Sequence, residues 1–136
     1  MDAMLASMRV SAAGMKAQGT RLRIIAENIA NADSLPAEPG DLPYRRKVVS
    51  FRNELERSTG LFQVRIHAIG PDLSRLAKKY MPDHPAADDQ GYVLAPNVDS
   101  LIEMMDMREA QRSYEANLNM VRTSKEMARD AINILR

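Results

Sequence analysis

The sequence of 136 residues contains no cysteine and no tryptophan, and only two phenylalanines and four tyrosines. The absence of cysteine excludes disulfides and thiolate metal ligands, and it leaves the redox compartment undetermined. A chain of this length with so few aromatic side chains is not expected to bury a large compact core.

Long hydrophobic runs and an excess of charge of one sign are also absent. No run approaches the roughly 18 apolar residues of a membrane span, and the N-terminus lacks the features of a secretory signal. The net charge of +1 is spread along the chain, with no basic stripe of the kind that nucleic-acid binding needs. We therefore expect no direct membrane span and no nucleic-acid partner. If the protein leaves the cytoplasm, we expect export without a cleaved signal peptide.

The first long helix is predicted from about Asp2 to about Asn31, because Pro36, Pro39 and Gly40 end it firmly. Its apolar residues follow the three-four heptad spacing of a coiled-coil seam, with one mostly small and one mostly large column. The seam residues are Leu5, Met8, Ala12, Met15, Gly19, Leu22, Ala26 and Ile29. The small column predicts close approach of a partner helix.

A second long helix is predicted from Ser100 to about Leu135, where Ser100 and Glu103 have the spacing of a capping box. It repeats the heptad pattern, interrupted by Gln111 and Lys125. The seam residues are Met104, Met107, Tyr114, Leu118, Val121, Ala128, Ile132 and Leu135. Beside them runs a second apolar column of Met120, Met127, Ala131 and Ile134. An apolar face this wide predicts more than one neighbour.

Polar residues on these helices are candidates for fixing register. Gln111 and Lys125 interrupt the second seam, where a polar residue selects one alignment against slipped alternatives. Asn28, Asn31 and Asn117 lie off the seams. These asparagines are either surface or helix-capping residues, or they form hydrogen bonds across a subunit contact.

Residues 35–98 have a different pattern, with short predicted strands at 47–51, 62–68 and 92–94 separated by proline and glycine. The predicted fold is mainly α with a small β-rich insertion. The helices in 1–34 and 99–136 pair as an antiparallel coiled coil and form one layer.

The one cluster with plausible catalytic or metal-binding groups contains Asp83, His84 and Asp88. A histidine flanked by carboxylates can hold a divalent metal or act as a base. A turn rich in proline and aspartate has a simpler structural role, because these residues set turn dihedrals and accept local amide hydrogen bonds. We expect no catalytic residue, no cofactor and no metal, and a small metal-dependent enzyme stays as one alternative.

Four segments together resemble the bacterial flagellar rod proteins, especially those of the proximal rod. They are RLRIIAENIANADS (21–34), PYRRKVVSF (43–51), HPAADDQGYVLAPNVD (84–99) and EMMDMREAQRSYEANLNMVRTSKEMARDAINILR (103–136). The Asn-Ile-Ala-Asn run at 28–31 is shared widely by rod and hook proteins. The run at 91–98 and the motifs after it are more specific.

The resemblance implies a structural subunit of the flagellar basal body that assembles helically around the export channel and carries torque towards the hook. Its implied partners are copies of itself, other proximal-rod and distal-rod subunits, the adaptor to the inner-membrane ring and, in transit, the flagellar type III export apparatus. The implied location is the rod that spans the periplasm. The main alternative is a coiled-coil interaction module or secretion chaperone that holds one partner.

Overall fold

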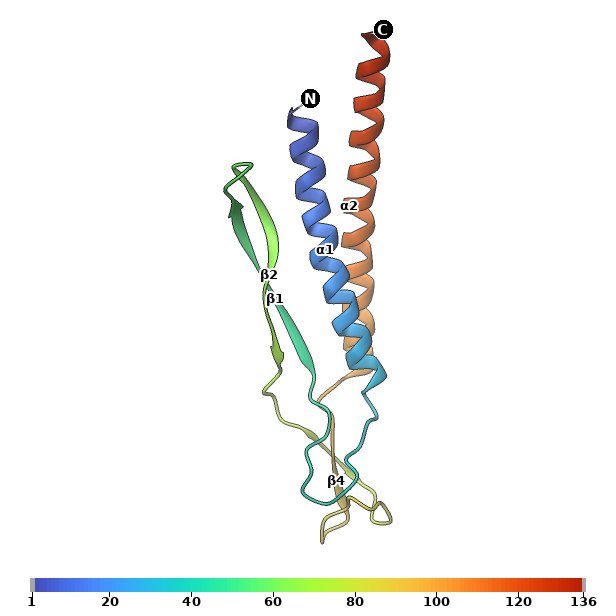
Figure 1. Cartoon of the computed structure of the whole chain (residues 1–136). Helices are drawn as coiled ribbons and strands as arrows, with labels where there is room; N and C mark the ends of the chain where they lie inside the picture. Colours follow the sequence, from blue (N-terminus) through green and yellow to red (C-terminus); the bar gives the residue numbers. More distant parts are fainter. Residues whose placement is uncertain (1, 136) are drawn as a thin grey trace. The chain divides into compact units, whose positions relative to one another are not determined.

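The computed structural model describes residues 2–135, which form two long helices and four strands (Figure 1). The elements in chain order are α1 (Asp2–Ala30), β1 (Lys47–Glu56), β2 (Leu61–Pro71), β3 (Ala77–Tyr80), β4 (Tyr92–Ala95) and α2 (Ser100–Ile134). The prediction of a mainly helical chain with a small β-rich insertion between two long helices is confirmed.

The chain divides into two compact units. The first unit contains residues 2–22, Val49–Ala68 and 108–135, and the second contains Arg23–Val48 and Ile69–Met107. Both units draw on all three predicted segments, 1–34, 35–98 and 99–136. That three-part division stays a prediction.

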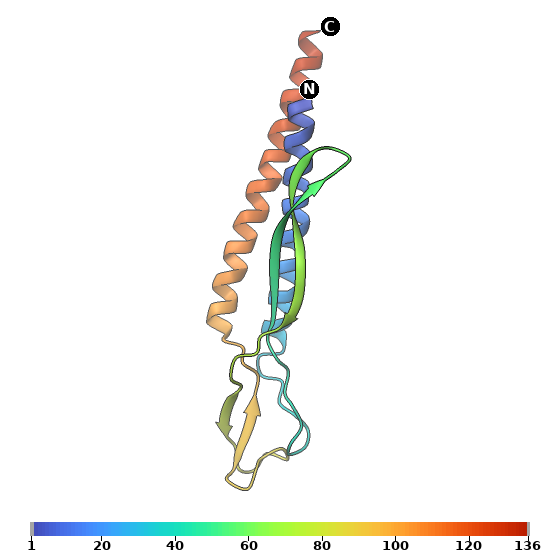
Figure 2. The ribbon, with the colours of Figure 1, turned by 90° about the vertical axis from the view of Figure 1, so that its left-hand side faces the viewer.

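In the first unit, α1 and α2 lie side by side and run antiparallel (Figures 1 and 2). Arg21 pairs with Glu109 at 3.6 Å, and Gly14 lies against Asn117 nearer the C-terminus of α2. The partner's residue number falls as the α1 number rises, as antiparallel pairing requires. Ala110 and Ser124 are buried and share a heptad column with Asn117, so they face α1 as well.

The β1–β2 hairpin lies along a different side of α1 in the same unit (Figure 2). Gly60, at a φ of +68°, completes the turn, and its N–H donates to the carbonyl of Glu56 at 2.8 Å. Arg65 on β2 pairs with Glu56 on β1 at 2.6 Å. Both strands are longer than the sequence predicts, because they continue through exposed residues such as Leu55 and Ile69, which lie beyond the predicted ends.

The second unit contains the antiparallel pair β3–β4, whose register places Ala77 opposite Ala95 and Tyr80 opposite Tyr92. The two tyrosine rings meet edge to face, with centroids 5.3 Å apart. All four residues of β3 are exposed, which explains why no apolar alternation predicted this strand. The buried side of the pair is formed by Val93 and Ala95 of β4.

Of the two glycines in α1, Gly14 packs closely against α2 and Gly19 does not. A Cβ at position 14 would lie 2.9 Å from Asn117 Nδ2, whereas a Cβ at position 19 would meet nothing within 4 Å. The expectation that the small column around Gly19 provides the close contact within the helix pair is therefore wrong. Apolar periodicity selected the column of Ala12 and Gly19, whereas Gly14 lies two positions after Ala12.

The two glycines make a matched pair for testing this contact. Gly19→Ala should stabilise the purified subunit by about 0.5–1 kcal/mol, since alanine favours a helix interior over glycine. Gly14→Ala should lose that gain and end about 1 kcal/mol or more below Gly19→Ala, because its methyl group displaces the Asn117 amide. Urea unfolding followed by far-ultraviolet circular dichroism measures both, and equal gains would contradict the Gly14–Asn117 packing.

Candidate functional site

The centre of the second unit is the side-chain amide of Asn28, which is 1% exposed. Its Nδ2 donates to the Lys47 carbonyl at 2.9 Å and to Glu103 Oε2 at 3.2 Å. Its Oδ1 accepts from the Tyr44 hydroxyl at 2.7 Å and from the Lys47 N–H at 2.9 Å. Two donors and two acceptors are the full capacity of a carboxamide. This one group therefore joins the end of α1, residues 44–47 (the strap) and the start of α2.

Glu103 is the second buried member of this cluster and is also 1% exposed. Its other oxygen, Oε1, accepts a hydrogen bond from Nε of Arg46 in the strap. Arg46 also pairs through Nη1 with Asp72 at 3.2 Å and through Nη2 with Asp106 at 3.5 Å. A buried carboxylate is tolerable only when it is paired and hydrogen-bonded, and Arg46 and Asn28 supply both conditions.

Hydrogen bonds, burial and neighbouring charges shift the pKa values of Arg46, Asp72 and Tyr44. Burial alone would lower the pKa of Arg46, but hydrogen bonding and attraction from Glu103 and Asp72 outweigh it and raise the pKa above its usual value. Hydrogen bonds from Ser74, first of all from its backbone N–H, lower the pKa of Asp72, and Arg46 lowers it further. Burial raises the pKa of the Tyr44 hydroxyl, which keeps it protonated as a donor to Asn28.

Asn97 connects the strap to the segment that follows β2. Its Oδ1 accepts from the Arg46 N–H at 2.8 Å, and its Nδ2 donates to the carbonyl of Asp72 at 3.0 Å and to Ser74 Oγ at 3.0 Å. A side-chain amide thus adds a donor and an acceptor between two segments that the backbone also joins, since the Asp72 N–H donates to the Arg46 carbonyl at 2.7 Å. Asn28, Glu103, Arg46, Asp72 and Asn97 form a cluster that we call the polar hub.

Capping residues define the helix ends in this unit. Asn31 closes α1, since its Nδ2 donates to the Glu27 carbonyl at 2.8 Å and its Oδ1 accepts from the Ser34 hydroxyl at 3.2 Å. Asp99 caps α2, because its Oδ1 accepts from the Leu101 N–H at 2.9 Å. The capping box predicted for Ser100 and Glu103 is wrong, because the Glu103 side chain is committed to the polar hub.

Asp88 and His84 stabilise a turn. Asp88 Oδ1 accepts from the N–H groups of Gln90 at 2.9 Å and Tyr92 at 2.8 Å. His84 Nδ1 accepts from the Ala86 N–H at 3.1 Å. Within residues 2–135, no group of three or more histidine, aspartate or glutamate side chains is arranged to hold a metal ion. These contacts match the structural role that proline and aspartate predicted for this segment.

The predicted seam residues divide into two sets. Met107, Tyr114, Leu118, Val121 and Ala128 on α2 are half-buried, as are Met8, Met15, Gly19, Leu22 and Ile29 on α1. The remaining members are exposed, and they are Leu5, Ala12, Ala26, Met104, Ile132 and Leu135. Gln111 and Lys125 are exposed too.

The positions that pack most closely carry small or polar side chains. On α2 the buried column in the first unit is Ala110 and Ser124 with half-buried Asn117, and on α1 it includes Ser11. Of the predicted polar contacts, Asn28, Asn31 and Asn117 form hydrogen bonds within the subunit, the last through Nδ2 to the Ser113 carbonyl at 2.9 Å. Their proposed role in subunit contacts stays a prediction.

Comparison with known proteins identifies two matching segments. The family described as "Flagella basal body rod protein" matches residues 8–34, and the one described as "Flagellar basal body rod FlgEFG protein C-terminal" matches residues 89–134. The flagellar basal-body rod protein FlgC of Agrobacterium fabrum is 45% identical over 136 residues, which cover 100% of this chain and 98% of that protein. The chain belongs to the flagellar basal-body rod family.

Two further FlgC proteins show how widely this similarity extends. The protein of Borreliella burgdorferi is 37% identical, over 97% of both chains. The protein of Bacillus subtilis is 34% identical, over 94% of this chain and 95% of that protein. The chain is thus a FlgC-like structural subunit of the rod, and the chaperone and metal-enzyme alternatives are not favoured.

The polar hub links the two segments that match the rod family. Asn28 lies in the first matched segment, and Asn97 and Glu103 lie in the second. Arg46 and Asp72 lie between the matches. No helix within residues 2–135 is long and apolar enough to cross a membrane.

Sequence reasoning missed most of the polar hub. Arg46 lies in the basic run from Arg45 to Lys47, but this run does not indicate that Arg46 pairs with Glu103, 57 positions away. One usable signal was present, since Glu103 is an acidic residue one position before the apolar column that starts at Met104. A charged residue beside a seam at a helix start is a candidate for a buried ion pair.

Substitution of Asn28 tests the hub. Asn28→Asp keeps the shape but replaces the donor to the Lys47 carbonyl and to Glu103 by an acceptor, so two buried acceptors lose their partner. We expect a loss of roughly 3 kcal/mol or more in the free energy of unfolding. Asn119→Asp, at an exposed position of α2, should stay within about 0.5 kcal/mol of the unsubstituted chain. Similar losses in the two variants would refute the central role of Asn28.

The lowered pKa of Asp72 predicts acid sensitivity. A carboxylate whose pKa is depressed by folding stabilises the folded state above its ordinary pKa of 3.8, and this stabilisation is lost as the pH falls through the folded-state pKa. Asp72→Asn should be less stable than the unsubstituted chain at about pH 6, and the difference should shrink as the pH falls below 3.8. Urea midpoints across this range provide the measurement, and a constant difference at every pH would contradict the shift.

Proposed function

We propose that this rod subunit assembles helically around the flagellar export channel, in the proximal part of the rod, and transmits torque towards the hook. The observation that carries the proposal is the exposure of large apolar side chains along both helices. On α1 and α2 they are Leu5, Val10, Leu101, Ile102, Met104, Met105, Met120, Met127, Ile132, Ile134 and Leu135. Apolar surface of this extent indicates protein contacts.

The neighbours of these faces are proposed from the family. They are copies of this chain, other proximal-rod and distal-rod subunits, and the adaptor that joins the rod to the inner-membrane ring. The flagellar type III apparatus would export the chain without a cleaved signal, and the assembled rod would span the periplasm. We propose no catalytic activity.

The helix pair suits a mechanical role. A contact between two different faces of neighbouring copies continues without closing, and so it builds a helical tube instead of a dimer. Methionine is unbranched and adapts its shape, which favours packing against neighbours that are not identical. Within each subunit, small residues and the polar hub hold the two helices, which leaves the large apolar side chains for contacts between subunits. We propose the predicted seam residues as members of this interface.

Substitutions at Met104 and Gln111, two exposed positions in one heptad column of α2, distinguish an effect on assembly from an effect on folding. Met104→Glu should leave the helix content of the purified subunit unchanged and should remove swimming, because a charge enters an apolar contact between subunits. Gln111→Glu, seven residues further along, should preserve swimming. The measurements are motility and the amount of subunit in purified basal bodies, in cells whose own copy is deleted. Full incorporation of Met104→Glu would contradict the proposed interface.

A further inference from the structure

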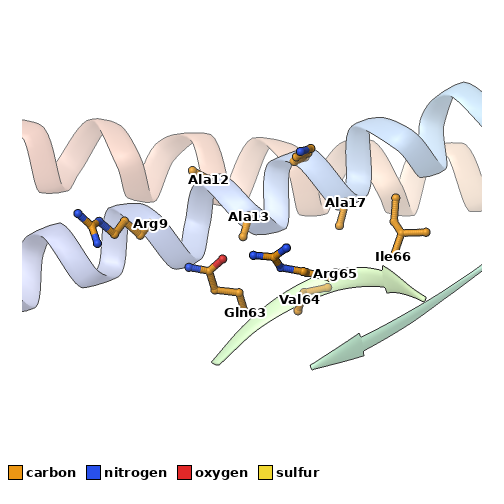
Figure 3. A pocket seen from close by; sticks show the side chains of 9 residues that line it. Arg9, Ala12, Ala13, Ala17, Gln63, Val64, Arg65 and Ile66 are labelled. Carbon is orange, nitrogen blue, oxygen red and sulfur yellow. The ribbon is translucent and has the colours of Figure 1, made fainter. Parts of the chain in front are cut away.

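A groove of about 540 Å³ runs between α1 and β2 within the first unit (Figure 3). Ala13 and Ala17 lie on the side of α1 that faces β2, and Val64 and Ile66 line the strand side. The small alanine side chains leave space between this part of α1 and β2. The groove is therefore an apolar depression that the subunit itself does not fill.

The groove has a basic rim. Arg9, Lys16 and Arg65 are three of its nine lining residues, and none of the nine is acidic. Arg65 shares its charge with Glu56, whereas Arg9 and Lys16 are exposed on α1. An occupant that combines apolar side chains with a line of carboxylates would match both the floor and the rim.

The C-terminal half of α2 presents such a surface. Met120, Met127 and Ile134 are spaced seven residues apart and are 51%, 52% and 84% exposed. We call these three residues the apolar stripe. Successive residues are about 100° apart around the helix axis, so Asp130 lies about 60° and Glu126 about 100° from Met127, both on the same side of the stripe. Lys125 and Arg129 lie about 160° from Met127, close to the opposite face of the helix. The stripe is thus flanked by acidic residues on its free side.

We propose that the groove of one subunit receives the apolar stripe of a second copy, with Asp130 and Glu126 of that copy facing Arg9 and Lys16. This inference rests on the proposed function, since it assigns one contact of the helical assembly. Its basis is the match between a basic, apolar groove and an acidic, apolar helix face, both present on the same chain. The two surfaces are different, so the contact is head to tail and continues from copy to copy.

The dimensions of the two surfaces agree. The groove extends along α1 from Arg9 to Ala17, which is about 12 Å of helix, and one heptad of the stripe covers about 10.5 Å. Two successive stripe residues therefore fit in one groove. In a tube whose subunits share an axis and a polarity, the second copy's α2 runs antiparallel to α1, as the subunit's own α2 does.

The absence of cysteine from the chain allows a direct test by disulfide crosslinking between copies. Cells without their own copy express two variants together, Gln63→Cys on the groove and Met127→Cys on the stripe. Basal bodies are purified and oxidised, and the yield of crosslinked dimer is measured. Matched controls pair Gln63→Cys with Arg122→Cys, on another face of α2, or with Met105→Cys, in the other exposed apolar part of α2.

We expect the Gln63–Met127 pair to give at least about tenfold more dimer than either control, because only that pair brings the two thiols into contact. Equal yields, a higher yield with Met105→Cys, or a product formed with a different protein would each overturn the assignment while the subunit remains in the rod. Absence of all variants and of the unsubstituted chain from basal bodies would instead refute the proposed function, and this inference with it.

A charge exchange tests the acidic flank separately. Lys16→Glu in the copy that carries Gln63→Cys should reduce the dimer yield severalfold, and Asp130→Lys in the copy that carries Met127→Cys should restore it. Helix content measured by circular dichroism verifies that both variants fold. A yield that does not change on charge reversal, or a loss that Asp130→Lys does not restore, would overturn the proposed pairing.

Discussion

The second unit depends on the carboxamide of Asn28, whose four hydrogen bonds use every donor and acceptor that the group has. The three elements that it joins share no strand or helix pairing, so few backbone hydrogen bonds would replace these contacts. Because the group is buried, each bond that is lost leaves a polar atom without water as a substitute. Asn28 also supports the buried charge of Glu103, which would otherwise depend on Arg46 alone. The end of α1, the strap and the start of α2 are therefore joined in this unit through one side chain.

Small and polar side chains pack between the helices of the first unit, whereas many large apolar side chains of the helices are exposed. Ala110, Ser124 and Gly14 pack inside the helix pair of the first unit, where their small size permits close approach. Large side chains such as Met104, Met127 and Ile132 stay exposed. We propose that burial between subunits removes this apolar surface from water and completes the stabilisation of each subunit. On this proposal, folding is linked to rod assembly.

Sequence reasoning predicted the two helices, the β-rich insertion and the family, because long periodic patterns and local motifs carry that information. It overlooked the buried residues Ser11, Ala110 and Ser124, because periodicity gives weight to methionine and leucine. The interface role of the seam residues stays a prediction. The strand β3 left no pattern because its residues are all exposed. The hub escaped prediction because Asn28, Arg46 and Glu103 are distant in sequence, and contacts between distant polar residues have no periodic signature.

The most direct test of the account is hydrogen exchange measured on the purified subunit and on the same protein in basal bodies. The account predicts that amides of the strap and around Glu103 are protected in both samples, since the polar hub forms within one subunit. It also predicts that the outer turns of both helices, near Leu5 and Met127, exchange rapidly in the purified subunit and become protected in the rod. Equal protection of those turns in the two samples would contradict the dependence of the helices on assembly.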